Sequence, residues 1–201
     1  MTTGVCYFTK EDNLMGSQDL AAFVEASDIS TRIGRVFTGQ VILVNAGTQL
    51  LHLMDHGAWS GSYTISTAKN GMGSQEGSEK TPHGLHCVVE KIGEGAAPLA
   101  VFSERKPTGE IATPQDPIGR IVGRILRLDG LEDEKNRGGN VDSFNRYIYI
   151  HGTNRLEELG FPKSRGCVRM DPEGVIDLFN RVHKDALVYI YGSPDQEIFG
   201  A

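Results

Sequence analysis

Glycine is the feature that most restricts what this chain can fold into. It makes up 25 of the 201 residues, about 12% against a usual ~7%. Glycine supplies the positive-φ corners that β-hairpins require. A chain of this size with so much glycine is therefore expected to be rich in turns and to contain β-strands. Hydrophobic residues at 39% and charged residues at 23% indicate an ordinary globular protein.

The charge balance and the chain ends limit the partners and the compartment. Twenty Lys and Arg residues against 26 Asp and Glu residues give a formal net charge of −6, so no nucleic-acid partner is expected. No stretch approaches the ~20 apolar residues of a membrane span, and no secretory leader is visible. Three widely spaced cysteines, Cys6, Cys87 and Cys167, cannot all pair within the chain. We therefore expect a cytoplasmic protein; if a leader has been removed, the alternative is the periplasm.

Short apolar segments alternate with glycine-rich turns along most of the chain. The chain divides into an extension, residues 1–38, and a main domain, residues 39–201. The extension carries a predicted amphipathic helix at 18–26 with Ser17 as N-cap. We expect this helix to pack its apolar residues, at 20, 23 and 24, against the main domain. A second helix is expected at 172–182 with Asp171 as N-cap. The pattern predicts a mainly β domain with one or two short helices. Strands are expected at 41–44, 50–54, 61–67, 85–91, 99–103, 121–128, 146–150 and 186–191, with exposed loops at 69–84, 104–117 and 129–140.

Residues 151–170 carry the clearest chemical signal. His151 follows a predicted strand, and Cys167 lies sixteen positions later within Ser164-Arg-Gly-Cys-Val-Arg169. Only the thiolate of a cysteine is strongly nucleophilic, and nearby cations such as Arg165 and Arg169 lower the pKa of a thiol. A Cys–His pair is suited to acyl transfer through an acyl-enzyme. The alternative for a single cysteine is a small buried hydrophobic residue, which the polar and glycine-rich surroundings disfavour here.

These motifs resemble the active-site signature of the L,D-transpeptidase catalytic domain (YkuD) family. The resemblance rests on His151-Gly-Thr and Ser164-x-Gly-Cys-Val-Arg169, and upstream on Ser66-Thr67, Gly71 and Thr81-Pro-x-Gly84 in the same order. It covers roughly residues 40–192. It implies a β-sandwich whose cysteine attacks the carbonyl of meso-diaminopimelate in a peptidoglycan tetrapeptide and expels the terminal D-alanine. It also implies that a carbapenem adds covalently to the cysteine.

The resemblance implies catalytic roles for the matching residues. Cys167 would be the nucleophile and His151 the general acid and base, with the carbonyl of Gly152 orienting the imidazole. The backbone N–H groups of Gly166 and Cys167 would form the oxyanion hole. Arg169, together with Ser164, would hold the loop.

Substrate binding is assigned to five positions around this pair. Arg165 stands where many family members carry histidine, and it could hold a carboxylate through two charge-assisted bonds. Its alternative is a solvated arginine that only adds positive charge near the thiol. The predicted substrate-binding residues are Ser164, Arg165, Tyr149, Thr81 and His83.

Other patterns in the chain carry weaker signals. His83, His86 and Cys87 lack the spacing of an established zinc site, and the glycines between 71 and 95 do not form a phosphate-binding fingerprint. We therefore expect neither a metal nor a cofactor. The stretch 92–140 is longer and more charged than a minimal domain of this family needs, so substrate choice stays open.

Three functions remain open on the sequence. The first is a cytoplasmic L,D-carboxypeptidase that trims tetrapeptides to tripeptides during murein recycling. The second is a periplasmic or wall L,D-transpeptidase that forms cross-links. The third is a non-catalytic wall-binding module, which the intact set of Cys167, His151 and Arg169 disfavours. The oligomeric state is not predicted.

Overall fold

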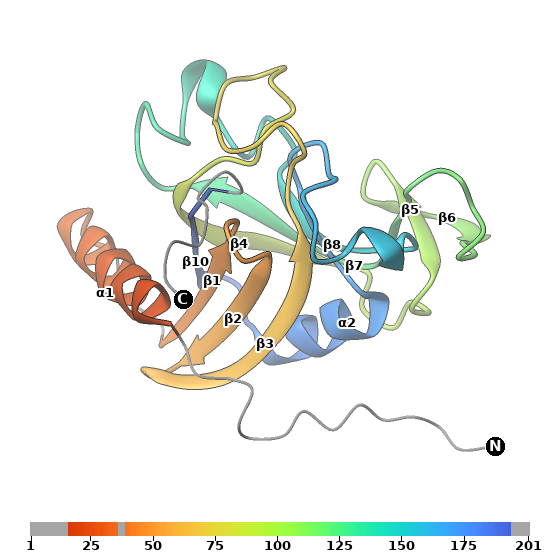
Figure 1. Cartoon of the computed structure of the whole chain (residues 1–201), viewed down its shortest axis with the longest axis horizontal. Helices are drawn as coiled ribbons and strands as arrows, with labels where there is room; N and C mark the ends of the chain where they lie inside the picture. The colour runs from red at the N-terminus through yellow and green to blue at the C-terminus, as the bar shows by residue number, and fades with distance from the viewer. Residues whose placement is uncertain (1–15, 36–38, 194–201) are drawn as a thin grey trace, which may run out of the picture.

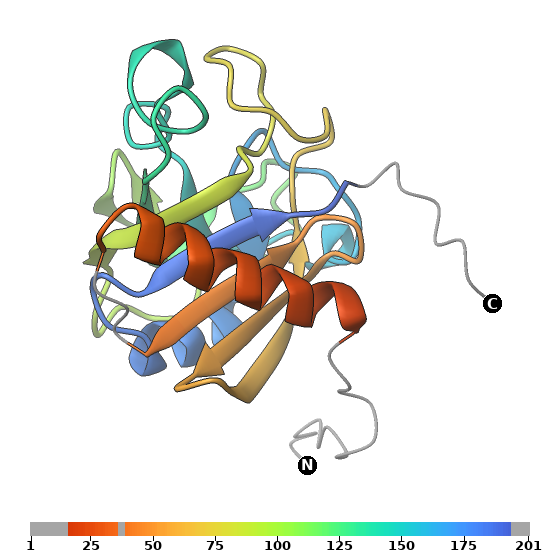
Figure 2. The same cartoon turned by 90° about the vertical axis from the view of Figure 1, so that its left-hand side faces the viewer.

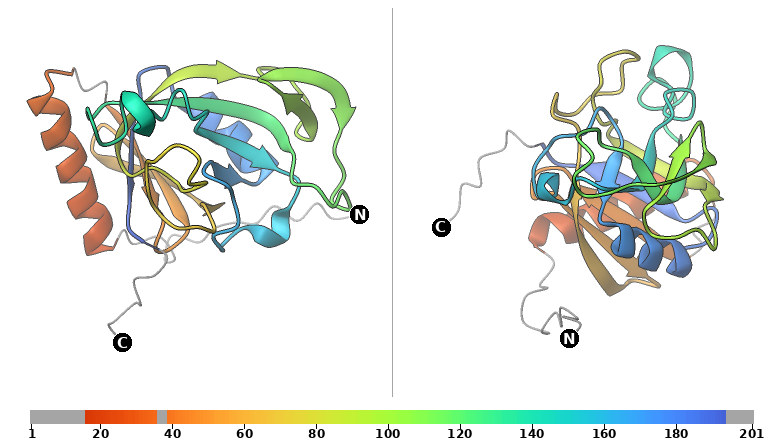
Figure 3. Two further views of the ribbon diagram at one scale, coloured as in Figure 1. Left: turned by 90° about the horizontal axis from the view of Figure 1, so that it is seen from above. Right: turned by 90° about the vertical axis from the view of Figure 1, so that its right-hand side faces the viewer.

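The ten strands in the part of the chain that the structure describes belong to one sheet that closes on itself. The computed structural model describes residues 16–35 and 39–193. The strand order is β4-β10-β1-β2-β3-β9-β8-β7-β5-β6, and a further pairing of β4 with β7 closes the first eight strands into a ring (Figures 1 and 3). The predicted mainly β class with one or two short helices is confirmed, and the described residues contain two α-helices. The strands are β1 Gln40–Asn45, β2 Leu50–Asp55, β3 Ala58–Ser66, β4 Gly84–Ile92, β5 Ala100–Ser103, β6 Lys106–Ile111, β7 Ile121–Gly130, β8 Tyr149–Thr153, β9 Val168–Met170 and β10 Leu187–Tyr191.

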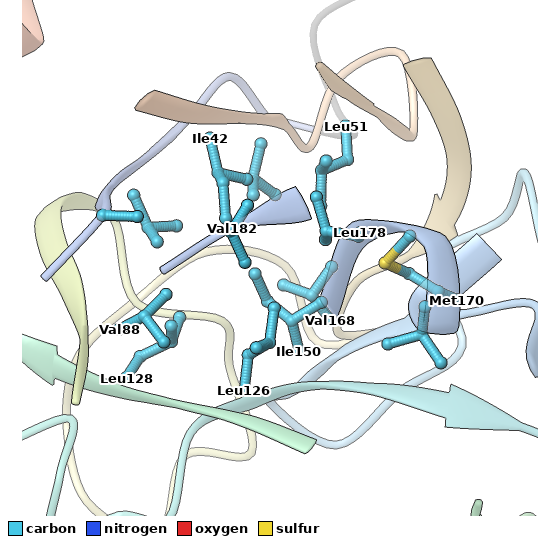
Figure 4. Close-up of a cluster of buried hydrophobic side chains, with 14 of the residues drawn as sticks. Ile42, Leu51, Val88, Leu126, Leu128, Ile150, Val168, Met170, Leu178 and Val182 are labelled. Atoms are coloured by element: carbon cyan, nitrogen blue, oxygen red, sulfur yellow. The ribbon is translucent and has the colours of Figure 1, made fainter. Parts of the chain in front are cut away.

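Strand β1 shows how the fold uses both faces of the sheet. Ile42 and Val44 point into the core enclosed by the ring, part of which is drawn in Figure 4. Val41 and Leu43 belong to a second cluster beneath helix α1, Ser17–Arg32. Successive side chains of a strand face opposite sides, and here each side meets apolar neighbours. This explains why the four central residues of β1, 41–44, are all apolar.

Helix α1 lies across the outer face of the sheet, over β10 and β1 (Figure 2). The predicted apolar face was wrong at two of its three residues: Leu20 and Val24 are 57% and 52% exposed, whereas Phe23 packs against the cluster that Ala22, Ala26 and Ile29 form with the sheet. The small alanines let the helix approach closely. The predicted N-cap was wrong as well, because the helix begins after Gly16.

A polar contact sets the rotation of α1. The carboxylate of Asp19 accepts hydrogen bonds from the Gly16 N–H, at 2.8 Å, and from the Asn45 side chain, at 3.0 Å. The Tyr191 hydroxyl donates to the same carboxylate. A buried carboxylate must find donors, so Asp19 faces the sheet and Leu20 and Val24 turn outward.

Two local predictions are confirmed by the structure. Strands β1 and β2 form an antiparallel hairpin around residues 46–49. Helix α2, Pro172–Arg181, begins at the N-cap Asp171, whose carboxylate accepts the Gly174 N–H at 2.6 Å. Both signals are local, because turn and cap residues act on backbone groups a few positions away.

Two predicted loops contain more structure than expected. Residues 106–111 form β6, which pairs with β5 although every residue in β6 is exposed. An exposed strand has no buried face to produce an alternating pattern. In the charged run 129–140, Asn136 is fully buried and donates to the carbonyls of His83 and Leu85. That run is an ordered loop tied to β4.

The strand predicted at 146–150 lies instead at 149–153. Tyr147 adopts a φ of +57°, which is incompatible with an extended strand. His151 therefore lies inside β8 rather than at a strand end. None of the helices in residues 16–35 and 39–193 has the length and apolarity needed to cross a membrane. The division of the chain between residues 38 and 39 stays a prediction.

Candidate active site

The parallel pairing of β8 with β9 brings His151 and Cys167 together. His151 is in register with Arg169, and Cys167 directly precedes β9. Both side chains line a cavity of about 300 Å³. The cavity is lined by Glu79, Gly119, Ile121, Arg146, Tyr147, His151, Ser164, Arg165, Cys167 and Arg169. The two residues that the sequence singles out thus share one cavity.

His151 is held as a neutral base. The residue is only 5% exposed, and its Nδ1 lies 2.9 Å from the carbonyl oxygen of Gly152. Because a carbonyl can only accept, Nδ1 carries the hydrogen and Nε2 of the neutral ring is free to accept a proton. Burial lowers the pKa of His151 to about 4, although the bond to Gly152 acts in the opposite direction. The contact expected between Gly152 and the imidazole is present.

Cys167 is a half-buried thiol whose Sγ–H donates to the carbonyl oxygen of Tyr147 at 3.4 Å. It packs against an apolar cluster that includes Tyr149. Burial raises the pKa of Cys167; a hydrogen bond with the backbone of Tyr149 and, after it, the charges of Arg169, Arg146 and Arg165 only oppose that rise. The arginines therefore do not produce a thiolate on their own, and the resting pair is a neutral thiol with a neutral imidazole.

The loop before β9 is fixed by side chains that bond to its backbone. The Ser164 hydroxyl donates to the Cys167 carbonyl at 2.6 Å and accepts the Gly166 N–H at 3.2 Å. Thr81 donates to the Gly166 carbonyl at 2.9 Å. Gly166 has a φ of +129°, which side-chain-bearing residues rarely adopt. Because the N–H of Gly166 is engaged with Ser164, the N–H of Cys167 is the remaining donor of the predicted oxyanion pair.

Three guanidinium groups line the cavity in different ways. Arg169 pairs with Glu158 at 2.5 Å. Arg165 is exposed and has no ionic partner among residues 16–35 and 39–193. Arg146 donates to the carbonyl of Lys80 at 2.7 Å, anchoring the loop of residues 67–83. Arg146 is a cavity residue that the sequence pattern did not reveal, because that pattern predicts a strand beginning at Arg146.

Three predicted substrate-binding residues lie outside the cavity lining. Thr81 is fully buried and reaches the site only through the backbone of Gly166. Tyr149 is buried beneath Cys167. His83 is exposed beside the 131–137 loop, with its backbone carbonyl bonded to Asn136. Ser164 and Arg165 do line the cavity.

Buried histidines predict how stability depends on pH. His86 is fully buried, with Nε2 3.0 Å from the Ser143 hydroxyl, and burial lowers its pKa to about 4, as it does for His151. The unfolded chain binds protons on both residues below about pH 6.5, whereas the folded chain does not until about pH 4. We therefore expect the melting temperature to fall steadily as the pH drops from 6.5 towards 4. A melting temperature that stays constant over pH 4.5–6.5 in calorimetry would contradict this assignment.

Comparison with known proteins places the site in a family. The model of the YkuD family, described as the L,D-transpeptidase catalytic domain, matches residues 39–190. A Bacillus subtilis (strain 168) protein named Putative L,D-transpeptidase YqjB is 29% identical over 142 residues, which cover 70% of this chain and 65% of that protein. The solved structure of L,D-transpeptidase 3 from Mycobacterium tuberculosis shares the fold with a TM-score of 0.50 at 16% identity, covering 76% of this chain and 61% of that one. The chain thus matches somewhat less than two thirds of the length of each relative. It belongs to the L,D-transpeptidase catalytic domain (YkuD) family.

Proposed function

We propose that the chain is a cysteine-dependent acyl-transfer enzyme acting on the meso-diaminopimelate–D-alanine bond of peptidoglycan tetrapeptides, and that it works as an L,D-carboxypeptidase. The observation that carries the proposal is the shared cavity of Cys167 and His151, with a free Nε2 on the imidazole. A non-catalytic wall-binding module would have no need for a buried base beside a thiol. Family membership supports the chemistry on peptidoglycan peptides.

The first half-reaction follows from the neutral pair. Sγ of Cys167 attacks the amide carbon while its proton passes to Nε2 of His151, since neither group is charged at rest. The negative charge that develops on the substrate oxygen requires a preorganised donor, which the N–H of Cys167 provides. The C–N bond then breaks, and His151 returns its proton to the amine of the leaving D-alanine. The product is a thioester on Cys167.

The second half-reaction decides between the two enzymatic functions. In a carboxypeptidase, water attacks the thioester and gives a proton to His151, which returns it to Sγ as the tripeptide leaves. In a transpeptidase, the amine of a second stem peptide takes the place of water. Mass spectrometry of a free tetrapeptide, incubated with and without an added amine, separates them. Release of D-alanine without an amine supports the carboxypeptidase; activity only with an amine or polymeric wall would favour the transpeptidase.

We extend the proposal to the substrate and the compartment. Three guanidinium groups and one carboxylate, Glu79, line the cavity, a balance that suits a substrate rich in carboxylates. A soluble tetrapeptide fits this description. Cys87 and Cys167 are both free thiols, in keeping with the reducing cytoplasm that we propose as the compartment. Fractionation of the native cells tests the location independently of the activity.

Arg165 is proposed to bind the terminal carboxylate of the tetrapeptide. It lies two residues before Cys167, lines the cavity and is exposed. We expect R165A to raise the KM for tetrapeptide about tenfold while kcat changes little, because binding to the ground state is lost. R165K should restore the positive charge but not the bidentate hydrogen bonding to the carboxylate. Steady-state kinetics of the three proteins check this, and a fall in kcat at unchanged KM would remove Arg165 from carboxylate binding.

A further inference from the structure

Tyr147 holds an unusual backbone conformation directly beside the thiol. Its φ of +57° lies in the left-handed region, which is rare for bulky residues. Such strain persists only where surrounding contacts enforce it. The carbonyl oxygen of Tyr147 accepts the Sγ–H of Cys167 at 3.4 Å, and its side chain lines the cavity with 53% of the residue exposed.

Two guanidinium groups lie over the ring of Tyr147, and one of them, Arg127, lies closer still to the ring of Phe144, at 3.4 Å. The Cζ atom of Arg105 lies 5.2 Å from the ring centroid, and that of Arg127 lies 5.6 Å from it. Both distances are within the range of cation–π attraction. Arg127 is anchored by Glu90, with 3.3 Å between nitrogen and oxygen. Arg105 is anchored by the hydroxyl of Tyr149, to which it donates at 3.1 Å.

Arg105 reaches the site from the tip of an exposed hairpin. Ser103 of β5 pairs with Lys106 of β6, so Glu104 and Arg105 form a two-residue turn, with φ values of +48° and +67°. Turns with positive φ at both positions favour Asn-Gly, because glycine adopts this conformation without strain. The chain instead places a long cation here. A second strained residue thus directs its side chain toward the first.

We propose that Arg105 and Tyr147 are positioning residues: the β5–β6 hairpin clamps the ring of Tyr147, and this keeps the Tyr147 carbonyl on the thiol of Cys167. The inference rests on the proposed function in taking Cys167 as the nucleophile. It also assigns a role to the β5–β6 hairpin, which lies within the charged stretch 92–140. In the sheet, β5 pairs with β7, the strand that carries Arg127, and β6 lies at the edge beyond β5 (Figure 1).

The physical consequence concerns the protonation and the direction of the thiol. A carbonyl that accepts Sγ–H stabilises the neutral thiol and fixes its rotamer. If the clamp is loosened, the neutral form loses that acceptor, and the thiol titrates at lower pH while pointing less often toward the substrate. None of the proposed variants alters the other ionisable side chains that line the cavity with Sγ. These are Glu79, Arg146, His151, Arg165 and Arg169.

Glycine substitutions in the turn separate positioning from stability. R105G removes the cation and relieves the positive φ, so we expect its melting temperature to equal or exceed that of the wild type. At the same time, kcat/KM should fall about tenfold, and the pH profile for alkylation of Cys167 should move to lower pH. E104G, at the neighbouring turn position, relieves the same kind of strain but should leave both the kinetics and the alkylation profile unchanged. Alkylation is followed at the Cys167 peptide by mass spectrometry.

Three further variants complete the test. R105Q keeps the side-chain length without the charge and should reproduce the shifted profile, whereas R105K should restore the wild-type profile. Y149F removes the hydrogen bond to Arg105 but leaves the cation at the Tyr147 ring, and should act more weakly than R105G. An unshifted alkylation profile in both R105G and R105Q would overturn the proposal. Because alkylation needs no peptide, a shifted profile in an enzyme inactive on tetrapeptides would uphold the clamp and refute the proposed function.

Discussion

We expect the C167A variant to lose tetrapeptide turnover by on the order of 10⁶-fold, since removing the nucleophile of a covalent mechanism leaves only binding and electrostatic effects. C87A should keep nearly full activity. Cys87 is 1% exposed, and burial raises the pKa of its thiol to about 11, so it is neither accessible nor ionised. C6A is expected to be equally silent; Cys6 lies outside the described residues. The measurement is release of D-alanine by each purified variant.

A covalent probe gives this prediction an independent readout. The family resemblance implies that a carbapenem acylates Cys167, which would add its mass to the intact protein. We expect that mass shift in the wild type and in C87A, and none in C167A. A folded C87A protein that is inactive, or a carbapenem adduct that persists in C167A, would show that the nucleophile has been assigned to the wrong cysteine.

We expect the H151A variant to lower kcat by about 10²–10⁴-fold, the usual contribution of a positioned acid and base. The structure adds a second expectation. Because the imidazole is buried within β8 and bonded to the carbonyl of Gly152, alanine leaves a cavity and an unpaired acceptor, so the melting temperature should fall as well. H56A is a matched control, since the side chain of His56 is 81% exposed. Kinetics at a temperature where H151A is folded separate the two effects.

Alkylation of Cys167 identifies which step uses His151. If the imidazole accepts the thiol proton, H151A should slow alkylation at neutral pH. Unchanged alkylation would mean that the thiol ionises without His151, and the histidine would then act only on the leaving amine. The neutral resting pair in the structure favours the first outcome, because burial raises the pKa of Cys167 and lowers that of His151.

Local signals in the sequence were sufficient for much of the fold. Hairpin β1–β2 and the N-cap of α2 depend on turn and capping residues that act over a few positions. The exposed strand β6 escaped prediction because it has no buried face, and the three-residue β9 is too short to show a period. These two strands form because neighbouring strands pair with them.

The motifs around His151 and Cys167 were enough to single out these two residues, which the structure places in one cavity. Their protonation and their surroundings depend on packing that the motifs do not encode. Arginines beside Cys167 in the sequence suggested a thiolate, yet burial outweighs their charges, since removing a charge from water costs more than partly exposed cations return. Likewise, the carboxylate of Asp19 accepts hydrogen bonds from β1 and β10. These bonds fix the rotation of α1, so the helix does not bury the whole apolar face that its sequence predicts. Arg105 meets Tyr149 across 44 positions of chain, and contacts at such separations arise from strand pairing, which no local pattern encodes.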